Sequence, residues 1–170
     1  MTLCQSFQSI EPTHMRVLIL GSMPGVASLC QQAYYAHPRN AFWPIMAQLL
    51  AVDWPHDFAP RYALLQQKQV GLWDVLAQCE RPGSLDKSIK TDSVQINDIP
   101  GLVARHNECR AIALNGQTAA ALFKRHLLST NGRLLTGLNI VELPSTSPAN
   151  ARLSLADKTR IWQDKLGYFL

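Results

Sequence analysis

Four short apolar runs divide the chain and predict the strands of a sheet. They are rich in Val, Ile and Leu and cover residues 16–20, 70–76, 110–114 and 138–143. Runs of this length and composition are typical of strands that are buried on both faces. We therefore predict four strands at these positions, the first of them buried.

Apolar residues at helical spacing fill the segments between and after the predicted strands. The clearest helix follows Asn40, a favourable N-cap, because apolar residues recur there three and four positions apart. We predict further helices over residues 61–69, after an Asn97 cap, and directly after Gly116. A last helix is predicted from the capping-box pattern at residues 154–157.

This alternation of strands and helices predicts the fold class. Parallel strands need crossover helices, which cover both faces of the sheet. We expect an α/β fold, a three-layer α/β/α sandwich around a mostly parallel four-stranded sheet. A length of 170 residues without repeats or low-complexity tracts fits a single domain over residues 1–170.

Composition and charge narrow the class of protein only slightly. Hydrophobic residues make up 47% and charged residues 16% of the chain, which is ordinary for a globular protein. The net charge of +4 mildly favours an anionic partner such as nucleic acid. There is no apolar run of membrane-spanning length and no charged leader, so we expect a soluble, cytoplasmic protein that does not contact membranes.

The cysteine pattern argues against a metal centre. Cys4, Cys30, Cys79 and Cys109 are scattered singly, without a C-x-x-C pair or a His/Cys cluster at zinc-ligand spacing. We expect reduced thiols and no metal or other cofactor.

Polar loops follow three of the predicted strands. They are GSMPG (residues 21–25), which leads to a polar and aromatic segment at residues 34–40, Asn115-Gly116, and PSTSPAN (residues 144–150). The carboxyl ends of parallel strands share one edge of a sheet, where ligands bind in open α/β folds. We expect the three loops to converge there.

Each loop also has a simpler interpretation. The hydroxyls of residues 145–147 suit phosphate, but such residues often cap their own turn. Arg39 can meet a phosphate or lie at a solvated rim, His37 can act as acid or base or hydrogen-bond its loop, and Tyr34 and Tyr35 can stack on a base or belong to the core. Nucleotide-binding glycine motifs and a G-x-S-x-G elbow are absent from the sequence.

Taken together, these segments resemble the uracil-DNA glycosylase superfamily, most closely its hypoxanthine-DNA (deoxyinosine) glycosylase branch. The resemblance rests on GSMPG (residues 21–25), YAHPRNAFW (residues 35–43), LNG (residues 114–116) and LPSTSP (residues 143–148). The mismatch-specific uracil/thymine branch is also similar, including at the RPGS loop of residues 81–84. AHPRN-x-FW is the specific motif, and the order of elements fits over nearly the whole chain.

The resemblance implies a monofunctional enzyme of DNA repair. Such an enzyme flips a deaminated base out of DNA, here preferably hypoxanthine from deoxyinosine, and hydrolyses its N-glycosidic bond to leave an abasic site. It implies DNA with deaminated bases as the partner, no metal, and a monomer. A lysine Schiff base is not implied by any motif.

The resemblance also implies site residues. Two departures matter: Met23 stands where the superfamily often has a polar water-positioning residue, and Leu143 stands where the classical uracil enzymes have a histidine. The catalytic residues are then expected to be Asn40 and Asn115. The base pocket is expected to contain Gly21, Ser22, Met23, Pro24, Gly25, Tyr35, His37 and Phe42. Contacts to DNA phosphates are expected from Arg39, Ser145, Thr146, Ser147 and Asn150.

Several alternatives stay open at this point. A uracil or mismatch-specific glycosylase would have the same fold. A catalytically silent α/β module that binds nucleic acid or nucleotides is the rival from another class, because Met23 and Leu143 remove polar groups from expected catalytic positions. Which asparagine positions the water, and whether Tyr35 or Phe42 stacks on the base, is likewise open.

Overall fold

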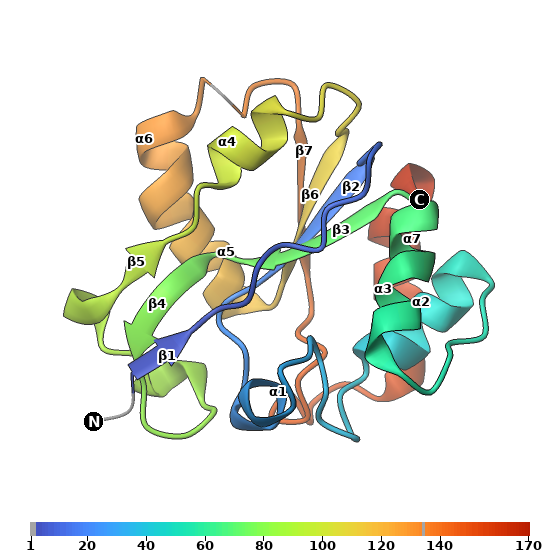
Figure 1. Cartoon of the computed structure of the whole chain (residues 1–170), viewed down its shortest axis with the longest axis horizontal. Coiled ribbons are helices and arrows are strands. Elements are labelled where there is room, and N and C mark those ends of the chain that lie inside the picture. The colour runs from blue at the N-terminus through green and yellow to red at the C-terminus, as the bar shows by residue number, and fades with distance from the viewer. Residues whose placement is uncertain (1–2, 134) are drawn as a thin grey trace.

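A parallel four-stranded sheet forms the centre of the computed structural model, which describes residues 3–133 and 135–170 (Figure 1). Its strand order is β3-β2-β6-β7, and all three neighbouring pairs are parallel. The predicted α/β fold and its four strands are confirmed. The strands are β2 (Val17–Gly21), β3 (Val70–Asp74), β6 (Ala111–Asn115) and β7 (Asn139–Leu143).

The register aligns the carboxyl ends of these strands. Gly21 pairs with Asp74, and Asn115 pairs with Leu143. Each of these residues is the last of its strand, so the segments that follow the strands start from one edge. The expected convergence of the loops therefore has a direct cause in strand pairing.

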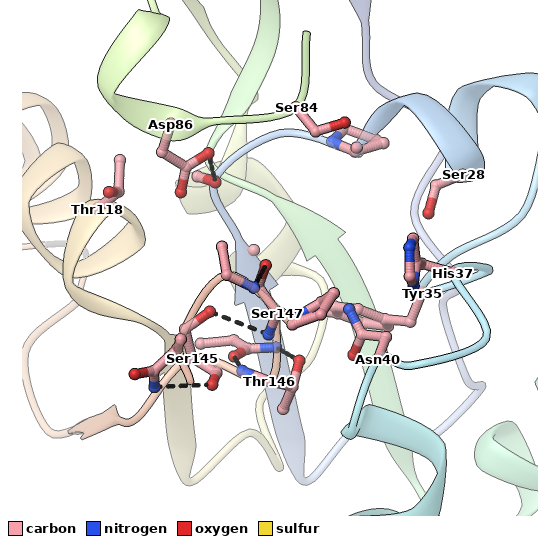
Figure 2. Close-up of a pocket in the computed structure, with 18 of the residues that line it drawn as sticks. Ser28, Tyr35, His37, Asn40, Ser84, Asp86, Thr118, Ser145, Thr146 and Ser147 are labelled. Atoms are coloured by element: carbon pink, nitrogen blue, oxygen red, sulfur yellow. Dashed lines mark hydrogen bonds between the residues drawn. The ribbon is translucent and has the colours of Figure 1, made fainter. Parts of the chain in front are cut away.

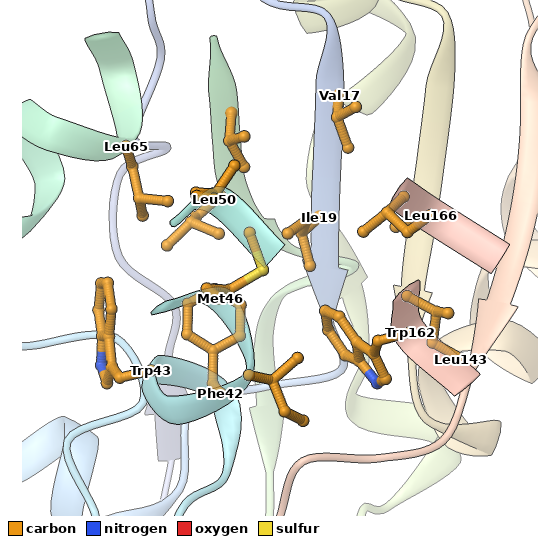
Figure 3. Packing of buried hydrophobic residues seen from close by; sticks show 14 of the residues in the cluster. Val17, Ile19, Phe42, Trp43, Met46, Leu50, Leu65, Leu143, Trp162 and Leu166 are labelled. Carbon is orange, nitrogen blue, oxygen red and sulfur yellow. The ribbon is translucent and has the colours of Figure 1, made fainter. Parts of the chain in front are cut away.

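Helices α2 (Phe42–Leu50), α3 (Phe58–Gln67) and α7 (Leu155–Leu166) cover one face of the sheet (Figures 1 and 3). Ile19 of β2 packs in the same buried cluster as Met46 of α2 and Trp162 of α7. Burial of side chains of this size stabilises a fold by about 1.5–3 kcal/mol each. This cluster anchors α2, which carries the AHPRN segment at its amino end.

Helices α4 (Ile99–Ala104) and α5 (Gln117–Phe123) cover the opposite face (Figure 1). Leu18 and Leu20 alternate with Val17 and Ile19 along β2 and pack in this second cluster. Helix α5 continues through a π-helical turn (Lys124–Leu128) into the short α6 (Ser129–Asn131). The predicted three layers are thus present.

A small antiparallel sheet was not predicted from the sequence. It joins β1 (Leu3–Gln5), β4 (Leu76–Glu80) and β5 (Gln95–Ile96) in the order β1-β4-β5. The apolar run at residues 70–76 therefore ends its parallel strand at Asp74, and a second strand starts at Leu76. The remaining short elements are α1 (Val26–Gln31) and the 3-10 turns Asp86–Ser88, Thr91–Ser93 and Gly167–Phe169.

The caps agree with the sequence only in part. Ser154 and Asp157 form the predicted capping box of α7. The prediction for Asn97 is wrong: Asp98 caps α4 by accepting from the Gly101 N–H at 2.9 Å, whereas Asn97 donates to the backbone of the β3–β4 junction. A carboxylate one residue later satisfies the first turn instead.

Two helix starts also differ from the prediction. Helix α2 begins at Phe42 with Ala41 at the N-cap position, but Ala41 has helical backbone angles and no capping side chain. The predicted Asn40 supplies the capping bond, because its Oδ1 accepts from the Phe42 N–H. Helix α3 begins at Phe58, before the predicted residue 61, since Pro60 is tolerated in a first turn. Within the described ranges, no helix is both long and apolar enough to cross a membrane.

Candidate active site

A cavity of about 690 Å³ lies where the sheet strands end (Figure 2). Its wall comes from residues 21–28, 84–86 and 144–150, together with Tyr34, Tyr35, His37, Asn40, Asp74, Asn115, Gln117, Thr118, Arg152 and Leu153. Most of the predicted pocket and loop residues line it, namely Gly21, Ser22, Met23, Pro24, Gly25, Tyr35, His37, Asn40, Asn115, Ser145, Thr146, Ser147 and Asn150. Phe42 and Arg39 do not.

Arg81 stabilises the GSMPG loop through hydrogen bonds to its backbone. Its side chain is fully buried, and its guanidinium donates to the carbonyl oxygens of Met23, Pro24 and Gly83. Asp86 lies 3.8 Å from the same guanidinium. A buried arginine with several acceptors is a rigid support, because its planar fork fixes the direction of each bond.

The loop after β4 adds two further contacts to this support. Ser84 Oγ accepts from the Val26 N–H at 2.9 Å, and Ser22 Oγ donates to Asp86 Oδ1 at 2.8 Å. Burial raises the pKa of Asp86, while Ser22, Arg81 and Thr118 lower it. The RPGS similarity noted in the sequence therefore corresponds to a loop that shapes the cavity wall.

Met23 lines the cavity but offers it no polar group, and its side chain is almost fully buried. It is 5% exposed and packs with Cys4, Leu76 and Cys79 in a small core under the second sheet. Leu143, the other departure from the superfamily pattern, is buried in the main cluster. Both substitutions thus place apolar side chains in apolar surroundings.

Tyr35 has an unusual backbone and an unpaired hydroxyl. Its φ of 54° lies in the left-handed region that non-glycine residues rarely adopt. Its ring stacks on Phe42 with 3.9 Å between ring centroids, and its buried Oη has no hydrogen-bond partner among the described residues. Phe42, predicted in the pocket, lies behind Tyr35 as its support.

Asn40 has one end of its amide bound and the other free. Oδ1 accepts from the Phe42 N–H at 3.0 Å, which fixes the orientation because a backbone N–H only donates. Nδ2 has no bond to a described residue. The neighbouring His37 accepts through Nδ1 from the Arg39 N–H at 3.1 Å, while the Arg39 side chain is exposed.

Asn115 is bound at both ends of its amide. Its Oδ1 accepts from the Thr146 N–H and its Nδ2 donates to Thr146 Oγ1, each at 2.9 Å. Gly116, with a φ of 106°, lets the next loop approach, since a Cβ there would lie 2.9 Å from Ser145 Cβ. The ends of β6 and β7 are therefore joined at Thr146.

The PSTSPAN loop bonds largely to itself. Ser145 Oγ accepts from the Ser147 N–H, Ser147 Oγ accepts from the Ala149 N–H, and Asn150 Nδ2 donates to Ser145 O. The self-capping of such hydroxyls is thus observed, yet the loop still faces the cavity (Figure 2).

Asp74 is a cavity residue that sequence reasoning missed. It is 4% exposed at the end of β3, and its Oδ2 accepts from Ser6 Oγ at 2.8 Å. Burial and the nearby Asp86 raise its pKa to about 7, against the lowering effects of Ser6 and Arg81. The signal was available, because a carboxylate within an apolar strand rarely lacks a role.

Arg152 was also missed, and it is the basic side chain among the described residues that line the cavity. It is exposed and forms no ion pair with another described residue. Within the described ranges, no group of three or more His, Cys, Asp and Glu side chains is placed to hold a metal ion.

Comparisons with known proteins agree on one family. Residues 7–165 match the family described as Uracil DNA glycosylase superfamily. A Hypoxanthine DNA glycosylase from Methanosarcina acetivorans is 31% identical over 153 residues, which cover 88% of this chain and 90% of that protein. A Hypoxanthine DNA glycosylase from Methanosarcina barkeri is 31% identical over 114 residues, or 66% of this chain and 71% of that protein.

A solved structure is similar over nearly the whole fold. It is the solution NMR structure of a Methanosarcina acetivorans protein provisionally assigned as a uracil DNA glycosylase. The TM-score is 0.76 and the sequence identity 28%, with 96% of this chain and 98% of that chain covered.

Proposed function

Because the chain belongs to the uracil DNA glycosylase superfamily, we propose that it is a monofunctional DNA glycosylase that releases hypoxanthine from deoxyinosine and leaves an abasic site. The observation that carries the proposal is the cavity at the ends of the parallel strands, whose wall contains Tyr35 and Asn40, the latter with a free Nδ2. The named relatives support hypoxanthine as the base.

The cavity suits a base that has left the duplex. A volume of about 690 Å³ is in the range of sites that enclose a small molecule. An enzyme of this type must extrude its target, which takes less free energy for a mispaired base such as inosine than for a normal pair. Tyr35, supported by Phe42 from behind, offers a rigid aromatic edge to the cavity.

The reaction we propose is hydrolysis at C1′ of the sugar. The C1′–N9 bond breaks and its electron pair goes to the base, while a water oxygen forms the new bond to C1′. The water loses one proton and the base gains one, so that hypoxanthine leaves neutral. Among the described residues that line the cavity none is lysine, which agrees with hydrolysis without an imine.

We assign to Asn40 the role of positioning the water that attacks C1′. Its Nδ2 is free to donate and its Oδ1 retains one lone pair, whereas the amide of Asn115 is already bound at both ends to Thr146. We assign Asn115 to holding the PSTSPAN loop in place. That loop, together with Arg39 and Arg152, is proposed to contact the flanking phosphates.

The test of the proposed function is base release from DNA. Duplex oligonucleotides with one deoxyinosine or one deoxyuridine are incubated with the protein in the presence of a chelator, and mild alkali then reveals abasic sites. We expect release from deoxyinosine well above release from deoxyuridine. Dominant uracil release would contradict hypoxanthine as the preferred base. No release from either duplex would contradict the proposal that the protein is a DNA glycosylase.

Asn40→Ala separates catalysis from structure. We expect a loss of base release of at least about 100-fold, as for removal of a group that acts in the transition state, with DNA binding retained. The matched control is Asp98→Ala, which removes a helix cap far from the cavity and typically costs about 1 kcal/mol of stability. Equal activity of the two folded variants would refute the assignment of the water to Asn40.

A further inference from the structure

Two polar groups in the cavity wall have no part in the reaction described above. They are Oδ1 of Asp74 and Oη of Tyr35, and both face the same point beside Gly21. A Cβ on Gly21 would lie 2.6 Å from Asp74 Oδ1 and 3.5 Å from Tyr35 Oη. Glycine at this position therefore leaves room for two side chains from different segments to meet at the end of β2.

Both groups are held in place but lack a partner. Ser6 fixes the Asp74 carboxylate through Oδ2, and no described residue donates to Oδ1. Tyr35 is held by its stack on Phe42. Its Oη is buried and makes no hydrogen bond of normal geometry, although it lies close enough to the Asn115 side chain to interact with it. Buried polar groups in folded proteins are nearly always hydrogen-bonded, so an oriented and unpaired pair in a cavity indicates a ligand.

The pair matches the chemical change that deamination makes. Deamination replaces an exocyclic amino group by a carbonyl and places a proton on the neighbouring ring nitrogen. Hypoxanthine and uracil therefore present an N–H beside a C=O. Adenine and cytosine present a bare ring nitrogen beside an NH₂ group, which is the opposite order of donor and acceptor.

We propose that Asp74 and Tyr35 read this difference: ionised Asp74 accepts from the ring N–H of a deaminated base, and Tyr35 donates to the adjacent carbonyl. The inference rests on the proposed function and names the groups that distinguish hypoxanthine and uracil from adenine and cytosine. Guanine and thymine also present an N–H beside a C=O, so this pair does not distinguish them from the deaminated bases. Adenine would turn the lone pair of its N1 toward the carboxylate. A site built for a hydrogen bond rejects an analogue that leaves its polar groups unpaired.

The protonation of Asp74 then controls selection. The charged or titratable groups that interact with it are Asp86 and Arg81 from the loop after β4, and Tyr34 and Tyr35 from the segment after α1. Burial is the largest cause that raises the pKa of Asp74, to about 7. Above that pH the carboxylate is an acceptor, and below it the group carries a proton.

Asp74→Asn tests the reading of the ring N–H. Because Ser6 donates to Oδ2, the amide oxygen of asparagine takes that bond and its NH₂ faces the cavity, so a donor replaces the acceptor. We expect release from deoxyinosine to fall roughly 10- to 100-fold at pH 8. The wild-type rate should fall below about pH 7, and the variant should lack this inflection. Asp53→Asn, on an exposed carboxylate outside the cavity, is the control.

Binding of the free bases tests selection without catalysis. Affinities for free hypoxanthine and free adenine are measured by titration calorimetry for the wild type and Asp74→Asn. We expect the wild type to prefer hypoxanthine, and the ratio of the two affinities to shift toward adenine by at least about 10-fold in the variant. An unchanged ratio in the folded variant overturns the inference.

Tyr35→Phe provides a second and independent variant. It keeps the stack on Phe42 and removes only Oη, so we expect hypoxanthine to lose more affinity than adenine. Some loss is expected for adenine too, because a hydroxyl can accept from its NH₂ group. Equal loss for both bases would overturn the role of Tyr35 in selection. If the wild type distinguishes the free bases but releases none from DNA, the proposed function fails and the inference stands. If the wild type releases the base from deoxyinosine and Asp74→Asn keeps the same base preference, the proposed function stands and the inference fails.

Discussion

At the scale of single residues, the ionised carboxylate of Asp74 destabilises the fold, and the same group is proposed to bind the flipped base. A buried carboxylate is destabilising when ionised, because the cavity wall replaces water around the charge. Only Ser6 donates directly to it among the described residues. A group kept under these conditions is typical of functional sites, where perturbed pKa values concentrate.

This cost predicts a pH-dependent difference in stability. The pKa of Asp74 is about 7 in the folded protein, against an ordinary value of 3.8. Folding is therefore favoured while Asp74 is protonated, and this contribution is lost as the pH rises from about 4 through 7. Relative to Asp74→Asn, we expect the wild type to become less stable over this range by up to about 4 kcal/mol.

Urea unfolding of both proteins between about pH 4 and pH 8 measures the difference, since other titrating groups are common to both. The gap should widen with pH and level off above about 7. A gap that is constant across the range would show that the carboxylate ionises as freely in the folded protein as in the unfolded chain.

At the scale of elements, the cavity depends on a loop that contributes little chemistry of its own. Arg81 connects the end of β4 to three backbone carbonyls, two of which belong to the GSMPG loop. Asp86 accepts from Ser22 of this loop, and Ser84 accepts from the Val26 N–H directly after it. The GSMPG loop is thus positioned by residues that follow it by about sixty positions in the chain.

Arg81→Met should therefore damage both stability and activity. It leaves three backbone carbonyls inside the protein without their donor, and each buried acceptor left unpaired typically costs about 1–3 kcal/mol. Chemical denaturation measures this loss. Arg105→Met is the matched control, because Arg105 pairs with Glu11 at the surface, where about 1 kcal/mol or less is expected. Similar losses in both variants would contradict a supporting role for Arg81.

The sequence predicted the sheet better than the site. Residues 111–114 form a continuous apolar run, which is typical of a buried strand. The second sheet escaped prediction because β1 and β5 contain three and two residues, and their pairing with β4 is non-local. Local patterns do not encode such pairings.

Most of the predicted site residues lie in loops or at the last position of a strand, whereas Asp74, which was missed, follows four apolar residues of β3. The GSMPG and PSTSPAN loops are rich in residues that strands exclude, so their position at strand ends was evident. Asp74 is enclosed by apolar neighbours, and its approach to Gly21 follows from the register of β2 and β3. Register depends on the assembled sheet, which the sequence does not show directly.

At the scale of the whole molecule, the charge of +4 is small for a protein that binds DNA. Affinity should then come from a few well-placed cations rather than from a general positive field. Arg152 lines the cavity and Arg39 is exposed beside it in the AHPRN segment, so both can face the backbone of the strand that carries the flipped base.

Arg152→Ala should weaken DNA binding for damaged and undamaged duplexes alike. We expect the slope of log affinity against log salt to decrease in magnitude by about 1, as for the loss of one phosphate contact. Fluorescence anisotropy over a series of salt concentrations measures the slope. The control is Arg160→Ala, whose side chain is 72% exposed on α7 beside Asp157. An equal slope for the two variants would exclude a phosphate contact by Arg152.

The place of β2 in the sheet has a consequence for synthesis on the ribosome. β2 is central and fully buried, yet its partners β3 and β6 follow it by about fifty and ninety residues. At about 5–20 residues per second, the apolar strand waits several seconds before its second neighbour has been made. The nascent chain thus exposes a fully buried apolar strand early, and this segment stays unpaired on one side until β6 has been made.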